Sequence, residues 1–502
     1  MSSAAITPGS EPTIPEFKEI LGHPAPLWML FMSEFWERFA FYGIRWALVL
    51  YIVEQFYGGN ATGEASANAT YGSYLALVYA SALFGGYVAD KVIGYQRSIL
   101  LGAGFMAAGL FMIAYPDHQI FNLGLATIIV GNGMFKPNIS TMVGKLYAIA
   151  DPRRDAGFTI FYMGINLGGF LAPIFTQLLA QKIFNTGDTP AYKIVFIAAG
   201  VGMILSLIWF AIGRRVLKGI GAPAQDAQSL SRVAYVALGA LCVIPLTYYV
   251  LSLGANTLAN ILFVLFGGLS AMLLVEGFRN GKAARDKVIA MLIIFVFNVL
   301  FFMFFEQAGS SFTFLTNKIV NRNAWGFDIP VAWYQSVNSL AIIGIAPIIA
   351  AIWVYLGKRN LNPTIPFKFG LGLIGNGLAF GFLMIALSTM VDANSKIPFW
   401  PLILVYVIQS IGELCLSPIG LSMVTKLAPT RLVGLGMGGW FLSTGIGNNL
   451  SGIFAAHVSG TTGLSVASAL SGYTFGFYSL VGAGVFLLLI SPIMQKLLHG
   501  VK

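Results

Sequence analysis

The chain alternates between long apolar stretches and short polar connections along nearly its whole length. Most apolar stretches run for about 20 residues or more, enough at about 1.5 Å per residue to cross a hydrocarbon layer about 30 Å thick. A lone strand could not satisfy its backbone hydrogen bonds in lipid, so these stretches predict helices. About fourteen spans are predicted, at residues 27–55, 71–91, 97–115, 118–147, 155–183, 193–214, 231–253, 258–280, 285–317, 330–357, 365–390, 396–427, 431–458 and 470–497.

The composition fits a chain whose main solvent is lipid. Of 502 residues, 57% are hydrophobic and 10% are charged, whereas about 25% of residues are charged in an ordinary soluble domain. We therefore expect an all-α integral membrane protein. The first 26 residues contain Glu11, Glu16 and Glu19 but no basic start or apolar run, which predicts a short tail rather than a cleaved signal peptide.

Basic residues cluster in every second connection between the predicted spans. Connections without Lys or Arg, such as 56–70 and 459–469, lie between the basic ones. Positively charged connections stay on the cytoplasmic side, so we expect a multi-pass protein of the cell (inner) membrane with both termini in the cytoplasm. The same alternation explains the net charge of +10 without a nucleic-acid ligand, because the charges do not share one face.

The order of the spans predicts four regions. A cytoplasmic tail at residues 1–26 precedes a six-helix bundle at 27–214, a linker with two additional helices at 215–284, and a second six-helix bundle at 285–498. The additional pair looks inserted, because the longest basic connections bound it. Two six-helix halves that rock about a site at the membrane midplane are the pattern of the major facilitator architecture.

The connection after the second span supports this architecture. Residues 85–97 read GGYVADKVIGYQR, which resembles the signature loop of the major facilitator superfamily. Its paired glycines would let helices approach closely, and Asp90 beside Lys91 and Arg97 can lock or release a cytoplasmic interface. The alternative, for the loop taken alone, is an ordinary turn with surface charges.

Seven ionisable residues lie well inside the predicted spans. A charge at the centre of a membrane helix costs about 2.5–3.5 kcal/mol, so seven unpaired charges would cost roughly 17–25 kcal/mol. We therefore expect them to pair and to line a cavity. Four are acidic and three basic, which leaves one net negative charge that a single bound proton would neutralise. They are Glu34, Glu37, Arg38, Arg45, Lys136, Glu306 and Glu413.

Four of these charges share one face of the first helix. Glu34, Glu37 and Arg38 have the spacing i, i+3 and i+4. Arg45 lies about three turns beyond Glu34, which places it about 16 Å farther along the axis on the same face. One interpretation is a salt-bridge network that only joins helices. Buried ion pairs are poor stabilisers, and this favours a functional role.

Five short motifs occur in spans of both halves. They are EFWERFAFYG at 34–43, GNGMFKPN at 131–138, FYMGINLG at 161–168, EQAGSS at 306–311 and GELCLSPIGLS at 412–422. Together they resemble the motifs of the proton-dependent oligopeptide transporter (POT) family, whose bacterial members also carry an extra helix pair. The first motif departs from the family pattern at Phe41, where the family usually has a tyrosine. Phe41 has no hydroxyl group with which to contact a ligand.

The resemblance implies a symporter that imports di- and tripeptides together with protons by alternating access. A peptide carries a carboxylate and an ammonium group, so its site needs both a cation and an anion. By resemblance, the basic side chains face the peptide carboxylate, whereas Glu413 and nearby amides receive the amino terminus. The resemblance assigns proton coupling to Glu34, Glu37, Arg38, Arg45 and Glu306. It assigns peptide binding to Arg38, Arg45, Tyr42, Tyr79, Lys136, Asn166, Phe305, Asn338, Glu413, Ser417 and Trp440.

Other functions stay open on the sequence alone. A facilitator for another small solute, such as nitrate or a drug, is the main alternative, although an anion would give Glu413 no amino group to bind. A channel is disfavoured because the two halves contribute opposite charges. An enzyme is disfavoured because the chain has no pattern of nucleophile and base or of metal ligands, and Cys242 and Cys415 predict no disulfide framework. We expect no cofactor or metal, protons as the coupling ion, the lipid bilayer as partner, and a functional monomer.

Overall fold

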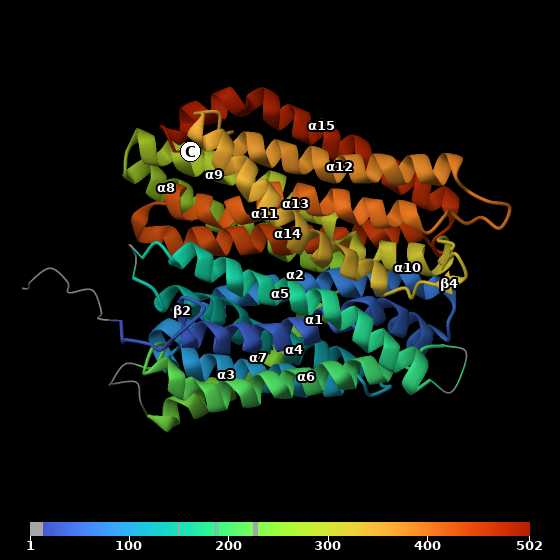
Figure 1. The fold of residues 1–502 in the computed structure, drawn as a ribbon, viewed down its shortest axis with the longest axis horizontal. Coiled ribbons are helices and arrows are strands. Elements are labelled where there is room, and N and C mark those ends of the chain that lie inside the picture. Colours follow the sequence, from blue (N-terminus) through green and yellow to red (C-terminus); the bar gives the residue numbers. More distant parts are fainter. Residues whose placement is uncertain (1–13, 149–150, 186, 188, 224–228, 502) are drawn as a thin grey trace, which may run out of the picture.

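The chain forms an all-α architecture in the computed structural model (Figure 1). The structure describes residues 14–148, 151–185, 187, 189–223 and 229–501. Part of the predicted tail, including Glu11, and part of the predicted linker therefore lie outside the described residues. The long helices are α1 (Ala25–Tyr57), α2 (Glu64–Val88), α3 (Tyr95–Met112), α4 (His118–Lys145), α5 (Arg154–Leu178), α6 (Tyr192–Gly213), α7 (Leu230–Ser252), α8 (Ala255–Arg279), α9 (Lys282–Phe305), α11 (Trp333–Lys358), α12 (Ile365–Thr389), α13 (Trp400–Leu427), α14 (Val433–Ser459) and α15 (Val466–Leu498).

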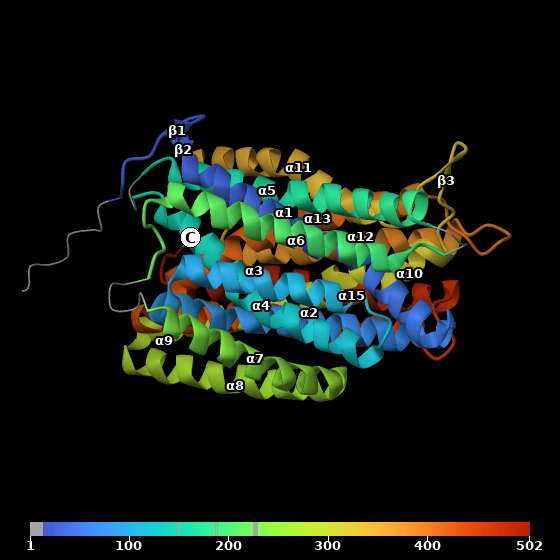
Figure 2. The same cartoon turned by 90° about the horizontal axis from the view of Figure 1, so that it is seen from below.

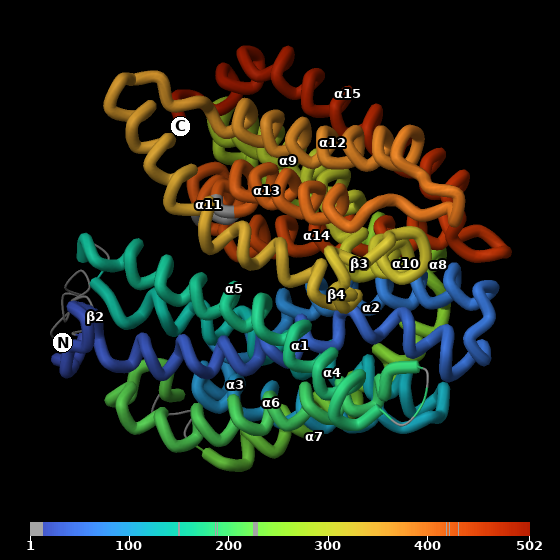
Figure 3. The backbone as a smooth tube through the Cα atoms, turned by 45° about the vertical axis from the view of Figure 1, so that its right-hand side comes forward, coloured from blue at the N-terminus to red at the C-terminus, as the bar shows by residue number. Residues whose placement is uncertain are grey.

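The helices gather into two bundles, which the tube in Figure 3 separates clearly. Helices α1–α6 pack on one another as the first bundle, and α9–α15 form the second. The described chain begins and ends at the same end of the bundles, here called the terminal end (Figure 1). The opposite end, here called the distal end, holds the short helix α10 (Ser311–Lys318) and the hairpin β3–β4 (Asn323–Ala324 and Phe327–Asp328).

Each predicted span overlaps a long helix. Eleven helical segments of the described chain are long and apolar enough to cross a membrane, and α3, α4 and α14 are not among them. Fully buried asparagines lower the apolar character of α4 and α14, namely Asn132 and Asn138 on α4 and Asn448 and Asn449 on α14. These two helices are surrounded mainly by protein, where amide side chains find partners that lipid could not offer.

The span predicted at 285–317 is wrong as one continuous helix. α9 ends at Phe305, and a 3-10 turn, η6 (Glu306–Gly309), precedes α10. Ser310 has φ −122° and ψ −103°, outside the helical region, so the helix must break there. Apolar residues continue on both sides of the break, which is why hydropathy did not reveal it.

The second helix also begins earlier than predicted. α2 starts at Glu64 rather than near residue 71. Asn60 caps a short 3-10 turn before it by accepting a hydrogen bond from the Thr62 N–H, and α2 follows directly. The first two turns of α2 read EASANAT, which is too polar to be recognised as part of a membrane span.

Polar and close backbone contacts join the two bundles in their distal halves. α2 packs along α14 so closely that a Cβ added to Gly72 would lie 2.6 Å from the Gly452 Cα. α5 packs on α11, where Ser336 donates a 2.8 Å hydrogen bond to the Phe170 carbonyl oxygen. The buried residues of α11 all lie between Tyr334 and Ile342, in its distal part. The distal end is therefore the closed end of the interface.

The additional helices α7 and α8 lie beside the bundles (Figure 2). α7 packs on α4 of the first bundle, and Ala240 and Ile244 lie in that contact. α8 packs on α14 and α9 of the second bundle, and Asn449 of α14 donates a 2.8 Å hydrogen bond to the Ala255 carbonyl oxygen. A short turn at Leu253 and Gly254 connects them at the distal end of α7. Each helix of the pair thus rests on a different bundle.

A small hairpin precedes α1 at the terminal end. β1 (Glu19–Ile20) pairs with β2 (His23–Pro24), and the His23 Nδ1 lies 2.8 Å from the Tyr147 hydroxyl oxygen. Arg153 donates a 2.6 Å hydrogen bond to Glu19. Hydrogen bonds from Arg153 also hold the pKa of Asp151 below its usual range. The hairpin is therefore fixed to the loop between α4 and α5.

The loop at 85–97 fits the predicted role only in part. Gly85 lies against the backbone of α4, as expected for close helix packing, whereas Gly86 faces open space. Asp90 pairs with Lys91 at 3.1 Å and accepts a 3.0 Å hydrogen bond from the Tyr95 hydroxyl group. Asp90 thus also contacts Tyr95 of the following helix, and a locking role of this loop stays a prediction.

Candidate functional site

A compact ion cluster lies in the first half of α1, on the side of the terminal end. The side chains of Glu34, Glu37 and Arg38 are at most 3% exposed. Arg38 forms ion pairs with both carboxylates, with 3.3 Å from its Nε to the Glu34 Oε1, and Asn132 of α4 donates a 3.1 Å hydrogen bond to Glu37. The cluster carries two negative charges and one positive charge when all three are ionised. The Glu34 Oε2 is buried without a hydrogen-bond partner.

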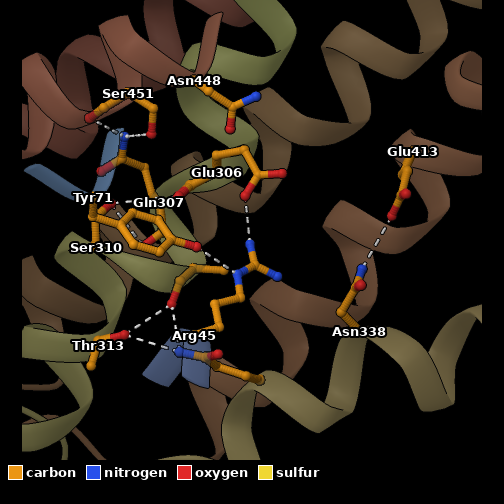
Figure 4. Close-up of polar contacts among 12 residues, drawn as sticks. Arg45, Tyr71, Glu306, Gln307, Ser310, Thr313, Asn338, Glu413, Asn448 and Ser451 are labelled. Carbon is orange, nitrogen blue, oxygen red and sulfur yellow. Dashed lines mark hydrogen bonds and ion pairs between the residues drawn. The ribbon is translucent and has the colours of Figure 1, made fainter. Parts of the chain in front are cut away.

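Arg45 joins the first bundle to the second at the distal side of the cluster. Its Nη2 lies 2.6 Å from the Glu306 Oε2, and its Nε donates a 3.1 Å hydrogen bond to the Tyr71 hydroxyl oxygen. Figure 4 shows this pair with Glu306 at the start of the broken helical segment. The break after α9 turns Glu306 toward the first bundle, so the predicted Arg45–Glu306 contact is present.

Hydrogen bonds from several helices hold the break in place (Figure 4). Gln307 donates a 2.9 Å hydrogen bond to the Ser451 hydroxyl oxygen and accepts one of 2.6 Å from Ser311. Gln335 donates to the Thr313 hydroxyl oxygen at 3.0 Å. Gln335 and Thr313 also each donate a 3.0 Å hydrogen bond to the Ala308 carbonyl oxygen, so side chains around the break satisfy a backbone group within it, as such a break requires.

Glu413 lies on α13, apart from the Arg45–Glu306 pair in Figure 4. The Asn338 amide donates a 3.2 Å hydrogen bond to the Glu413 Oε2 and a 2.9 Å hydrogen bond to the Ser410 hydroxyl oxygen. Glu413 takes part in none of the salt bridges among the described residues. The second bundle therefore presents a half-buried carboxylate that is oriented by an amide and lacks a counter-charge.

Aromatic rings flank the basic side chains of the first bundle. The Lys136 Nζ lies 4.5 Å from the centre of the Tyr79 ring. The Tyr42 ring lies 5.9 Å from the guanidinium carbons of both Arg38 and Arg45, between the two charges. Phe41 lies 4.8 Å from the Arg38 guanidinium carbon. The ring that replaces the expected tyrosine thus contacts Arg38 by its face, a contact that needs no hydroxyl group.

Three predicted binding residues, Asn166, Phe305 and Trp440, make contacts within their own bundle. The Asn166 amide donates to the Tyr162 carbonyl oxygen of its own helix at 2.9 Å. Phe305 stacks on a neighbouring ring of α9, and Trp440 lies between two phenylalanine rings at 6.1 Å each. Ser417 is half-buried on α13. A role of these three residues and of Ser417 in peptide binding stays a prediction.

Sequence reasoning missed Tyr71, Asn132, Ser410 and Gln307. Each holds a predicted residue in place through a hydrogen bond or helps to form the break after α9. Asn132 and Gln307 lie within two of the motifs, which was a usable signal. Tyr71 and Ser410 lie outside all five motifs, and only spatial proximity identifies them.

Comparison with known proteins gives consistent results. A family model described as the POT family matches residues 96–469. The peptide transporter YePEPT of Yersinia enterocolitica is 34% identical over 480 residues, which cover 91% of each chain. Dipeptide and tripeptide permease B of Xenorhabdus bovienii is 33% identical over 481 residues, which cover 94% of each chain.

A solved structure shares the arrangement of helices. It is the crystal structure of a mutant of a peptide transporter POT in complex with alafosfalin. The two structures superpose with a TM-score of 0.80 at 33% identity, over 96% of this chain and 97% of the other. The similarity therefore extends over both bundles and the additional helix pair.

Proposed function

This chain belongs to the POT family, and from that membership we propose that it imports di- and tripeptides together with protons. The family model, the similar transporters and the shared major facilitator fold make it a multi-pass membrane transporter of peptides rather than an enzyme. Proton coupling, the direction of transport, peptide length and action as a monomer are the parts that we propose.

Charges of opposite sign on the two bundles support a zwitterionic cargo. Lys136, Arg38 and Arg45 belong to the first bundle, and Glu413 belongs to the second. Glu413 forms no salt bridge with any described residue, and this observation carries the proposal, because the ammonium group of a peptide would supply an ionic partner. Nitrate offers no such group, so it accounts less well for this carboxylate.

The ion cluster of α1 supports a proton as the coupling ion. Its net charge of −1 in a site at most 3% exposed is unfavourable, and one proton neutralises it. The Glu34 Oε2, without a partner, is the oxygen that this proton would occupy with least disturbance. Glu306 is the second acceptor, because a proton there would free Arg45 and let the distal halves part.

The basic connections support cytoplasmic placement of the terminal end. Arg153, Arg214 and Arg215 follow helices that end there, so the positive-inside bias puts this end in the cytoplasm. The distal end then faces outward. With its distal contacts formed, the structure is closed to the outside.

A transport assay with a single cargo tests the proposal. In proteoliposomes, labelled dialanine should accumulate when an inward proton gradient is imposed and should only equilibrate when the gradient is dissipated. Unlabelled tripeptide should compete, and nitrate should not. Equal uptake with and without the gradient would rule out proton coupling, and competition by nitrate alone would favour an anion facilitator.

The carboxylate and the amino group of the peptide should bind to different residues. Lys136→Ala should weaken binding of free dialanine about tenfold or more, because a charge-assisted contact to the carboxylate is lost. Dialanine amide, which lacks that charge, should lose much less. Glu413→Gln should show the reverse pattern, with a large loss for free dialanine and a small one for N-acetyl-dialanine. Binding constants of the purified variants measure both effects.

The blocked peptide serves as the control for each variant. Each variant is compared with two ligands, so a general loss of folding would lower both affinities alike. Equal losses for free and amidated peptide in Lys136→Ala would show that Lys136 does not contact the carboxylate. Equal losses for free and acetylated peptide in Glu413→Gln would remove Glu413 from the amino-terminal site.

A further inference from the structure

The two short hairpins, one at each end of the molecule, share an uncommon turn. β1–β2 turns through Leu21 and Gly22, which have φ 52° and 76°, and β3–β4 turns through Trp325 and Gly326, which have φ 51° and 91°. A two-residue turn with positive φ at both positions usually begins with Asn, Asp or Gly, because a bulky side chain rarely adopts the left-handed conformation. Both hairpins of this chain instead place a large apolar residue there.

Both apolar side chains at these tips point away from the protein. Leu21 is 82% exposed and Trp325 is 94% exposed, although the Trp325 ring touches the edge of Phe399. The neighbouring residues Ile20 and Phe327 are exposed as well. Packing within the described chain therefore does not account for a strained backbone with a large apolar side chain at each tip.

Polar contacts hold the first hairpin in a fixed orientation. Glu19 accepts a 2.6 Å hydrogen bond from Arg153, in the loop between α4 and α5. Successive side chains of a strand point to opposite faces, so Ile20 faces away from this loop. The Trp28 ring N–H donates a 3.1 Å hydrogen bond to the Ile20 carbonyl oxygen. The hairpin is thus attached to the first bundle, and its tip projects from it.

The second hairpin is attached to the second bundle in a similar way. The Asn323 side-chain oxygen accepts a 3.0 Å hydrogen bond from the Gly326 N–H, and its amide group donates one of 3.2 Å to Asp328. The Phe327 ring lies 5.8 Å from the ring of Trp333, the first residue of α11. These contacts fix the turn and connect the hairpin to the distal end of α11.

Both hairpins project on the same side of the molecule, the side of α5 and α11 (Figure 2). α11 runs between the two ends on this side and exposes apolar residues such as Leu340 and Ile348. Its 26 residues span about 39 Å at about 1.5 Å per residue. A bilayer with its headgroups is about 40–45 Å thick. The hairpins are therefore separated by about the distance between the two surfaces of a bilayer.

Tryptophans lie at the same levels as the hairpins. At the terminal end, Trp28 contacts the first hairpin, and exposed Trp209 donates a 3.2 Å hydrogen bond to the Met29 carbonyl oxygen. At the distal end, Trp333 contacts the second hairpin, and exposed Trp400 begins α13. Tryptophan is enriched at both interfaces between membrane and water. Both hairpins thus lie at the level of lipid headgroups.

We propose that the two hairpins are anchors in opposite surfaces of the bilayer, with Leu21 and Trp325 inserted among phospholipids. The tips enter the boundary between the headgroups and the acyl chains, where an apolar side chain leaves water and the polar hairpin backbone stays hydrated. One anchor belongs to the first bundle and the other to the second. Each bundle is therefore held at a different surface of the membrane.

Spin labels at the two tips test the insertion directly. Leu21→Cys and Trp325→Cys carry a nitroxide in the full chain, in vesicles of phosphatidylcholine and phosphatidylglycerol. Cys242 is exposed and is replaced by serine, whereas Cys415 is buried and stays. Oxygen concentrates in the hydrocarbon and a nickel chelate stays in water, so the ratio of their collision rates with the label gives its depth. We expect both tips about 5–10 Å below the level of the phosphates, the depth that interfacial apolar side chains reach.

Asparagine at each tip should release the hairpin from the lipid without disturbing its shape. Asn followed by Gly suits this turn better than Leu or Trp does, so Leu21→Asn and Trp325→Asn keep the hairpins and remove the apolar contact. The label is then placed on the neighbouring exposed residue, Ile20 or Phe327. We expect this label to move about 5 Å or more toward water when the tip is asparagine, because the insertion of the apolar tip is lost.

Labelled Asp155→Cys and Asn394→Cys are the matched controls, since both residues are exposed polar positions, one at each end, and should lie in water. Tips as hydrated as these controls, or an unchanged depth in the asparagine variants, would overturn the anchors. A tip that neither oxygen nor nickel reaches would be covered by protein, such as a second copy of the chain, and would overturn them as well. The measurement uses no cargo, so a failure of dialanine uptake would refute the proposed function without affecting this result.

Discussion

Arg38→Ala is expected to abolish proton-driven uptake and to lower the free energy of unfolding by about 3–5 kcal/mol, the usual cost of removing one partner from a buried ion pair. Arg38 is the cation of the cluster formed with Glu34 and Glu37, and all three side chains are at most 3% exposed. Its loss leaves two carboxylates close together without the cation that pairs with both of them. Thermal unfolding of the purified protein and dialanine uptake measure the two effects.

A variant in which the cluster carries no charge distinguishes the effect on the free energy of unfolding from the effect on proton-driven uptake. The triple variant Glu34→Gln, Glu37→Gln and Arg38→Met removes all the charges at similar volume, so it should recover most of the lost stability. It should still fail to couple uptake to the proton gradient. A thermally stable Arg38→Ala protein with wild-type uptake would show that Arg38 neither neutralises the cluster nor contributes to coupling.

Glu306→Gln should keep peptide exchange but lose accumulation driven by a proton gradient. The amide imitates the protonated carboxyl group, which removes the charge that holds Arg45 at 2.6 Å. The distal halves can then part without a proton, so the cycle continues but no longer depends on the gradient. Counterflow exchange and gradient-driven uptake, measured in the same liposomes, give the two values to compare.

Glu276→Gln provides the control for this experiment. Glu276 is a carboxylate near the terminal end of α8 and contacts Asn280, which directly follows this helix. Its substitution should leave both activities unchanged. If Glu306→Gln accumulates peptide like the wild type, Glu306 is a structural partner of Arg45 only. Proton coupling should then be sought at Glu34 and Glu37.

Hydropathy and charge spacing were enough to predict most of the fold. The apolar spans located the long helices, and the spacing of Glu34, Glu37 and Arg38 predicted one charged face, which the structure confirms. The same method predicted a continuous helix through Glu306 and a late start of α2. Hydropathy averages over a window and does not sense the local backbone conformation of Ser310 or the capping of Asn60.

The site was predictable where a charge requires a partner. A buried arginine must meet an acid, and resemblance identified Glu306 as the partner of Arg45. Residues that contribute only a hydroxyl group, such as Tyr71 and Ser410, need no charged partner, so a single sequence does not indicate their role. The start of α2 at Glu64 was not predicted for another reason. Residues 64–70 are polar and were interpreted as part of a loop.

The placement of α7 and α8 on different bundles makes this pair a natural position for fluorescent reporters. Leu230 at the start of α7 is 79% exposed and Phe278 near the end of α8 is 62% exposed, both at the terminal end. Dyes at these two positions would lie outside the transport path, and each would follow its own bundle. We expect their energy transfer to change during each transport cycle. A constant signal during active uptake would mean that both helices move with a single bundle.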